Sequence, residues 1–254
     1  YADFIMEGGT IYDNGNSGVS VAGDGTFTMS GGTISGNTVS SGSGGGVYVS
    51  NGTFTMLGGT ISGNTSSSSG GVYVSSGTFT MSGGTISGNT FSSSGGSVLV
   101  NNRGSFTMTG GTISENSGRG VLVDYSGSFT MSGGIISGNT TSGNGGGVYV
   151  NYAGSFTMSG GIISGNTTSG NGGGVFVSRT FNEDRWGYET GTFIKSGNSI
   201  IYGNDAYDTS LKNTATGNSY GHAVYINSSK KRNSTAYAAD TMDSRLSGSA
   251  GGWE

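Results

Sequence analysis

The sequence predicts an all-β protein built as a solenoid, in which short strands wind into stacked coils. One phrase of about 25 residues recurs along the 254-residue chain, and such self-similarity is typical of repeat architectures. Gly occurs 55 times, Pro is absent and only 9% of the residues are charged. An average globular domain has about 25% charged residues, so this composition excludes an ordinary α/β enzyme and a helical bundle. Regularly spaced aromatic residues argue against disorder, and Gly without a three-residue period excludes collagen.

The repeat begins with GTFTM or GSFTM, continues as GGTISGN and ends, after a Gly- and Ser-rich stretch, in GGVYV or a close relative. Between Phe27 and Phe156, the phenylalanine of this phrase recurs at spacings of 27, 25, 27, 23 and 27 residues. The variants FIM and GTFIK extend the array at its two ends. We therefore expect about eight coils of 23–27 residues, which start near these phenylalanines: Phe4, Phe27, Phe54, Phe79, Phe106, Phe129, Phe156 and Phe193.

Each coil contains three short segments that are typical of strands, with Gly, Ser and Asn turns between them. In TFTM, the two-residue period of a strand places Phe27 and Met29 on one face and the threonines on the other. In TIS the inward residue is Ile34, and in VYV the inward residues are Val47 and Val49. One coil cannot bury these five side chains alone, but stacked coils share one continuous core.

An asparagine follows the middle strand of every predicted coil. Asn tolerates a left-handed backbone, and its amide can pair with the copy one coil above. A stacked column at one corner explains the repetition without a ligand, and we favour this structural interpretation over a functional one. The predicted column contains Asn14, Asn37, Asn64, Asn89, Asn116, Asn139, Asn166 and Asn204.

The phrase GTFTMSGGTISGNT followed by GGGVYV resembles the repeat of bacterial cell-surface and autotransporter-like proteins. The later segments FIKSGNSIIYGND and GHAVYINSSKKR resemble the way such arrays end. The resemblance covers residues 4 to about 232 and implies a right-handed parallel β-helix. It also implies an extracellular, bacterial cell-surface location, where related chains serve as adhesins and surface fibres.

The distribution of charge excludes nucleic acids as partners. The net charge is −4, and residues 25–102 carry no charged side chain, so the basic stripe that nucleic acids require is missing. The chain has no Cys, which excludes disulfides and thiolate metal sites. No run approaches the ~18 apolar residues of a membrane-spanning helix, so no transmembrane segment is expected.

Parallel β-helices also include polysaccharide lyases and glycosidases, whose chemistry needs paired carboxylates or Ca²⁺-binding acids on one exposed face. No acids lie at matched positions of neighbouring coils. We therefore predict that the protein is not an enzyme and has no catalytic, cofactor-binding or metal site. The charged residues between positions 25 and 178 are Arg103, Glu115, Arg119 and Asp124.

The insertion SRTFNEDRWGYET, residues 178–190, is the one charged loop between two coils. Its Trp186 could stack on a sugar or, in the interpretation we favour, pack over a coil as part of a surface loop. Asp205 and Asp208 could bind a metal ion, but two acids in a long turn are ordinary. The only histidine, His222, replaces a turn Gly, so a catalytic triad is excluded.

The middle residues of the VYV-type segments form a predicted outer column that we call the aromatic ladder. We expect it to be exposed, so that it could stack carbohydrate rings or pack against another subunit. β-Propensity alone would equally explain these residues. The ladder contains Tyr48, Tyr73, Leu99, Leu122, Tyr149, Phe176 and Tyr225.

The Thr-x-Thr pairs of TFTM, such as Thr26 with Thr28, form a second outward pattern. The grid is similar to that of ice-binding solenoids, but its first column changes to Ser at Ser105 and in the next two coils. Thr also pairs well across strands without any ligand, which is the interpretation we favour.

We predict a parallel β-helix over residues 1–232, with the insertion at 178–190 between coils seven and eight. Residues 233–254 form a C-terminal tail that acts as a cap or as a connector between subunits. The repeat starts within three residues of Tyr1, which leaves no room for a capping helix, so we expect either that the chain is an excised piece of a longer surface protein or that the next subunit covers this end. The leading functional hypothesis is a structural fibre or stalk subunit that associates head-to-tail with itself. The alternative is a monomeric glycan-binding adhesin that uses the aromatic ladder or the Trp186 loop.

Overall fold

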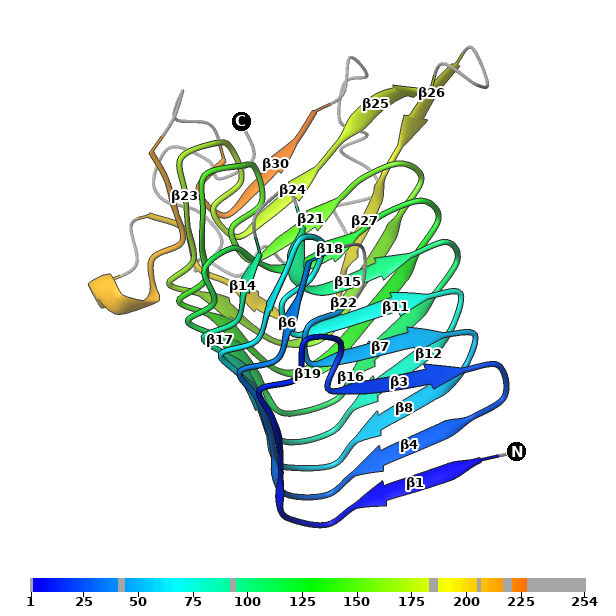
Figure 1. Cartoon of the computed structure of the whole chain (residues 1–254). Helices are drawn as coiled ribbons and strands as arrows, with labels where there is room; N and C mark the ends of the chain where they lie inside the picture. Colours follow the sequence, from blue (N-terminus) through cyan, green and yellow to red (C-terminus); the bar gives the residue numbers. More distant parts are fainter. Residues whose placement is uncertain are drawn as a thin grey trace.

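The computed structural model of the chain describes residues 2–40, 44–91, 95–182, 187–204, 207–216 and 221–227. In this part of the chain, short parallel strands stack into an elongated solenoid with β1 at one end and β30 at the other (Figure 1). The predicted all-β solenoid of stacked coils is therefore confirmed. The C-terminal tail predicted at 233–254 lies outside the described residues.

The VYV-type segments form one parallel sheet. Each strand pairs in register with the strand one coil away, so that Val47, Val72 and Val98 are direct neighbours. Within the described residues this sheet has eight strands, one from each predicted coil. They are β3 (Val19–Ala22), β7 (Val47–Ser50), β11 (Val72–Ser75), β15 (Gly96–Asn101), β18 (Arg119–Val123), β21 (Val148–Val150), β24 (Val175–Val177) and β30 (Val224–Ile226).

The TFTM and TIS segments lie in one large sheet, because in two coils they join into single ten-residue strands. The TFTM row contains β1 (Asp3–Met6), β4 (Thr26–Met29), β8 (Thr53–Met56), β12 (Thr78–Met81), β16 (Ser105–Met108), β19 (Ser128–Ser137), β22 (Ser155–Ser164) and β27 (Thr192–Lys195). The TIS row contains β2 (Thr10–Tyr12), β5 (Thr33–Ser35), β9 (Thr60–Ser62), β13 (Thr85–Ser87), β17 (Thr112–Ser114), the second halves of β19 and β22, and β28 (Ile200–Ile201).

The structure adds a two-residue strand after the corner asparagine, which the sequence analysis did not predict. These short strands form two small parallel sheets: β6 (Thr38–Val39), β10 (Thr65–Ser66) and β14 (Thr90–Phe91), and then β20 (Thr140–Thr141), β23 (Thr167–Thr168) and β29 (Thr214–Ala215). The insertion folds as an antiparallel hairpin of β25 (Arg179–Asn182) and β26 (Gly187–Thr190), which projects from the stack (Figure 1). A 3₁₀ turn, η1 (Thr209–Leu211), interrupts the last coil.

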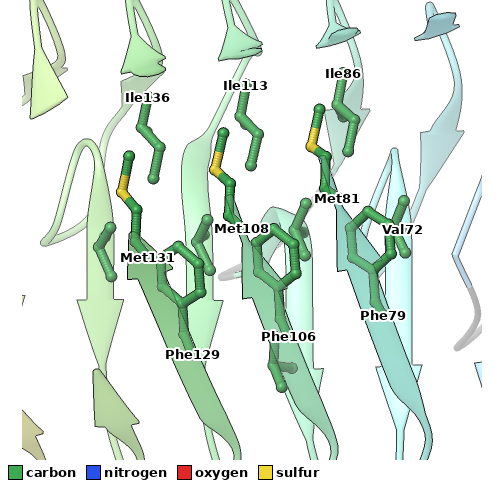
Figure 2. Packing of buried hydrophobic residues seen from close by; sticks show 14 of the residues in the cluster. Val72, Phe79, Met81, Ile86, Phe106, Met108, Ile113, Phe129, Met131 and Ile136 are labelled. Carbon is green, nitrogen blue, oxygen red and sulfur yellow. The ribbon is translucent and has the colours of Figure 1, made fainter. Parts of the chain in front are cut away.

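The core lies inside the solenoid and repeats from coil to coil. Figure 2 shows the same set of Phe, Met and Ile side chains in successive coils, with the rings above one another. The ring of Phe106 stacks on those of Phe79 and Phe129 at centroid distances of 4.6 and 4.7 Å. In the interior coils these phenylalanines are at most 1% exposed. The predicted register of the phenylalanines is therefore confirmed.

Candidate functional site: the asparagine ladder and the N-terminal edge

The corner asparagines form a continuous hydrogen-bonded ladder. Each side-chain Nδ2 donates to the Oδ1 of the asparagine in the next coil, at 2.7–3.1 Å. The backbone N–H of each asparagine donates to the same oxygen, at 2.9–3.2 Å. The members, which we call the Asn ladder, are Asn14, Asn37, Asn64, Asn89, Asn116, Asn139, Asn166 and Asn213.

Asn204 was expected to be the last member, and this expectation is wrong. Asn204 is exposed, whereas Asn213 is fully buried and accepts from Asn166. The reason is that the last coil makes a longer excursion, which includes η1, before the chain returns to the corner. The expected left-handed backbone also belongs to another residue. It is the residue before the asparagine that has positive φ, such as Gly36 at 66° or Glu115 at 56°.

The first coil leaves the N-terminal edge of the solenoid open, an edge formed by β1, β2 and β3. Phe4 stacks on Phe27 at a centroid distance of 5.0 Å but remains 44% exposed, because no ring covers its other face within the described residues. Ile5 is 64% exposed and Tyr12 is 62% exposed. This is the largest break in the burial of a core that is otherwise continuous.

The backbone of β1 has unpaired groups at this edge. Thr26 N donates to Ala2 O at 3.0 Å, and Ser30 N donates to Met6 O at 2.9 Å. Successive residues of a strand point their N–H and C=O groups to opposite sides. The groups of Asp3 and Ile5 therefore point away from β4, into the open side of the edge. Such a row of free donors and acceptors is a template for another strand.

The charged groups of the first coil are all acidic. Asp3, Glu7, Asp13 and Asp24 are exposed, and no Lys or Arg precedes Arg103 in the sequence. Asp3 accepts a hydrogen bond from Thr26 Oγ1 at 2.6 Å.

The opposite end of the core is closed. Phe193 is 6% exposed, Val224 is 2% exposed and Ile201 is fully buried, although they belong to the last coil. Lys195 takes the place that methionines occupy in the earlier coils, since it is paired in register with Met158, and it is 7% exposed. The two ends of the solenoid are therefore unequal in both exposure and composition.

The aromatic ladder is in register, but the expectation that it would be exposed is wrong. Leu99, Leu122 and Phe176 are buried, at 7%, 6% and 3% exposure, and the tyrosines are only partly exposed. The cause is the Gly-rich segment before each strand, which lies against the ladder. A Cβ placed on Gly145 would be 2.7 Å from Tyr149 Cβ, so only glycine permits this approach. The partly exposed members are Tyr48, Tyr73, Tyr149 and Tyr225.

In the middle of the stack, the sheet of VYV-type strands carries a charged cluster centred on Arg119. Arg119 is 5% exposed, its Nη1 donates to Gly95 O at 3.1 Å, and its guanidinium carbon lies 4.9 Å from the centre of the Tyr149 ring. Burial raises the pKa of Asp124 to about 6, although hydrogen bonds from Tyr125 and Asn151 and the charge of Arg119 all act to lower it. Burial also lowers the pKa of Arg119. The cluster is internally bonded and contains one carboxylate, so it lacks the pair that glycoside hydrolysis needs.

The sequence analysis missed a stacked tyrosine pair at the turn that follows the VYV strands. Tyr125 and Tyr152 stack at a centroid distance of 4.8 Å with an interplanar angle of 6°; Tyr125 is 50% exposed and Tyr152 is partly exposed. The signal was present, because each tyrosine stands two residues after the end of its strand, β18 or β21, in adjacent coils.

The remaining candidate residues have structural roles or lie outside the described part. Trp186 and Asp205 are outside it. Asp208 caps η1, because its Oδ1 accepts from the Ser210 hydroxyl at 2.7 Å and from Ser210 N at 2.9 Å. The hydroxyl bond first, and then the backbone bond, lower the pKa of Asp208. His222 Nδ1 accepts from Ala215 N at 3.2 Å. Among the described residues, no group of three His, Cys, Asp or Glu side chains could hold a metal ion.

No helix in the described part of the chain has the length and apolar character that crossing a membrane requires.

The geometry defines a parallel β-solenoid, a fold that suits a structural or binding role. The chain matches the family model described as the right-handed β-helix region over residues 2–130 and 78–238. Because these ranges together cover most of the chain, the protein belongs to the right-handed β-helix family. No curated protein and no solved structure matches the chain.

Proposed function

We propose that the protein is a non-enzymatic structural solenoid of the bacterial cell surface, a fibre or stalk subunit that associates end-on with itself. The observation that carries this proposal is the parallel, in-register pairing of like strands from coil to coil, which the coils of a second copy can continue. In the chain as described, a further coil at β1 would bury the ring of Phe4, which is 44% exposed, and would pair the backbone groups of Asp3 and Ile5. Association that does not close on itself yields a filament.

The composition of the outer surface supports a structural role. The outward columns of the large sheet consist mainly of Thr and Ser, which pair well across strands and need no ligand. The charged cluster around Arg119 holds a single carboxylate, Asp124, so it does not support bond cleavage by a carboxylate pair. The extracellular location follows from the resemblance to cell-surface repeats.

The substitution Ile5→Pro tests the proposal, because proline removes the Ile5 N–H that points into the open edge. Proline is tolerated in an edge strand when its missing N–H would face solvent, so the fold should survive. We expect the wild-type chain to form rods whose length grows with concentration in sedimentation velocity and electron microscopy. Ile5→Pro should require at least about tenfold more protein to associate, and the control Ile5→Val, which keeps the N–H, should match the wild type. A wild-type chain that stays monomeric up to its solubility limit would overturn end-on association.

A second candidate function, glycan binding by a monomeric adhesin, is favoured by one observation. Tyr125, which is exposed, stacks on the partly exposed Tyr152 beside Asp124 and Asn151, and aromatic rings with nearby polar groups are suited to sugars. Under this alternative, Tyr125→Ala should abolish binding on a glycan array, while the control Tyr12→Ala at the N-terminal edge should not.

A further inference from the structure

The turn that leads from a VYV strand to the next TFTM strand is longer in coils four to six than in the two coils before them. Phe106 follows Val100 by six residues, whereas Phe54 follows Val49 by five. The long turns lie next to one another, because the strands on both sides of them pair in register. In the following coil, the hairpin of β25 and β26 replaces this turn and projects from the same edge of the stack (Figure 1). The three long turns, which we call the turn patch, are residues 101–104, 124–127 and 151–154.

The backbone of the turn patch holds two tyrosines in the left-handed region. Tyr125 has a φ of 41° and Tyr152 has a φ of 34°. In the shorter turns, the residues with positive φ are Asn51 and Ser76, whose side chains are small. A bulky residue with positive φ is an outlier, and such strain is concentrated at functional sites. The tyrosines are therefore kept at the surface against the preference of their backbone.

The stack of the two tyrosines ends in the middle of the solenoid. Tyr125 packs on Tyr152 at a centroid distance of 4.8 Å and is 50% exposed. In coil four the matching position holds Asn102, which is exposed, so no third ring continues the stack on that side. A sugar has an apolar C–H face, which packs on an aromatic ring, and a polar edge, which needs hydrogen-bonding partners. Tyr125 with Asn102 beside it supplies both kinds of surface.

Arg103 is the one cation in the sequence of the turn patch, and it is exposed. Its backbone N–H donates to Tyr125 O at 3.2 Å, which places its backbone beside that of the exposed tyrosine. In the described part of the chain Arg103 forms no ion pair. The carboxylate of the patch, Asp124, accepts from Tyr125 N at 3.0 Å, and the cation whose charge acts on it is Arg119. Arg103 is thus available for a carboxylate from outside, which an arginine binds through two parallel N–H···O bonds.

We infer that the turn patch binds the end of a glycan that carries one carboxylated sugar, such as a sialic acid or a single terminal uronate. The sugar ring packs on Tyr125, and its carboxylate pairs with Arg103. A polyuronate does not fit, because it brings a carboxylate with every sugar. The patch answers with one cation and a carboxyl group of its own, and the chain has a net charge of −4. The inference rests on the second candidate function, whose ligand class it names, and does not depend on end-on association.

A glycan array tests the ligand class. It carries glycans that end in sialic acid or in one glucuronate, each beside its carboxyl-reduced form, together with polygalacturonate and heparin as polyanions. We expect the full-length chain to bind the acid-ended glycans at least about tenfold more tightly than their reduced forms, because reduction removes the partner of Arg103. The two polyanions should bind no more tightly than the reduced forms.

Substitution of Arg103 tests the charged contact. Arg103→Asn removes the charge but introduces a residue that tolerates positive φ, so the fold should survive. It should weaken binding of the acid-ended glycans by at least about tenfold and leave binding of the reduced forms unchanged. Arg103→Lys keeps the charge without the two parallel bonds and should give an intermediate affinity. The control Lys212→Gln removes a positive charge just after η1, outside the patch, and should change neither affinity.

The outcomes separate this inference from the second candidate function. Tyr125→Ala should remove binding of the acid-ended and the reduced glycans alike, whereas Tyr125→Phe, which keeps the ring, should match the wild type. Equal binding of acid-ended and reduced glycans, a preference for the polyanions, or equal losses in Arg103→Asn and Lys212→Gln would overturn the inference and leave glycan binding intact. Binding of acid-ended glycans that survives Tyr125→Ala would overturn the assignment to the turn patch. A chain that binds no glycan on the array would overturn both the inference and the second candidate function.

Discussion

Asp124 is a carboxylate at a position where the matching residues of other coils are neutral. It occupies the position after a VYV strand where Ser50, Ser75 and Asn151 stand in other coils. Ser and Asn stay neutral in this half-buried place, whereas a carboxylate loses part of its hydration. The pKa of about 6 is the consequence, since burial outweighs the hydrogen bonds and the charge of Arg119.

The raised pKa makes stability depend on pH. In the unfolded chain Asp124 titrates near 3.8 and in the folded chain at about 6, so the folded state binds the proton more tightly. The contribution of Asp124 to the free energy of unfolding is therefore lost progressively as the pH rises from about 4 to about 6. We expect Asp124→Asn to raise the free energy of unfolding at pH 7 by about 1–3 kcal/mol and to leave it unchanged below pH 4. Urea titrations at the two pH values check this, and a variant that is less stable than the wild type at pH 7 would contradict it.

At the scale of the element, one coil is stabilised by contacts with the coils above and below it. Phe106 is 1% exposed and lies between two rings at 4.6 and 4.7 Å. Phe106→Ala should lower the free energy of unfolding by about 3–5 kcal/mol, because it removes a large buried side chain and leaves a cavity.

Phe4→Ala at the open edge provides the matched control for Phe106→Ala. Phe4 has one stacked neighbour and is 44% exposed, so Phe4→Ala removes less buried surface. We expect its cost to be less than half that of Phe106→Ala in the same denaturant titration of the monomeric chain. Equal costs would mean that the column of rings does not set the stability of the coil.

The element scale also shows what the sequence could predict. The alternation of inward and outward residues in TFTM and VYV predicted which side chains enter the core. The parallel register followed from the repeat, because corresponding strands of successive coils pair with each other. Exposure of the aromatic ladder depended instead on the path of the Gly-rich segments, which are visible in the sequence but whose position over the sheet the strand alternation does not determine. Asn204 was assigned to the ladder by its local phrase, but the excursion through η1 moved the corner to Asn213. The direction of the Asn ladder required the amide hydrogen bonds themselves.

At the scale of the whole molecule, the solenoid is a one-dimensional stack in which each coil contacts only its neighbours. The first coil has a neighbour on one side only, and its backbone groups at Asp3 and Ile5 face solvent. Opening from this end exposes less buried surface than opening in the middle. Local stability should therefore be lowest in β1, β2 and β3 and rise toward the interior coils.

Amide hydrogen exchange followed by mass spectrometry checks this gradient and links it to association. In dilute protein, peptides from residues 2–24 should exchange at least about tenfold faster than peptides from the coil at 79–101. If chains join end-on as proposed, the first coil gains a neighbour at raised concentration, so its protection should rise while that of the interior coil stays constant. In the Ile5→Pro variant, the amides of the first coil should exchange rapidly at both concentrations, because this variant lacks the N–H that an incoming coil would have to pair. If, in dilute protein, the first coil is already as well protected from exchange as the interior coil, this edge is not open. The docking site would then have to lie elsewhere.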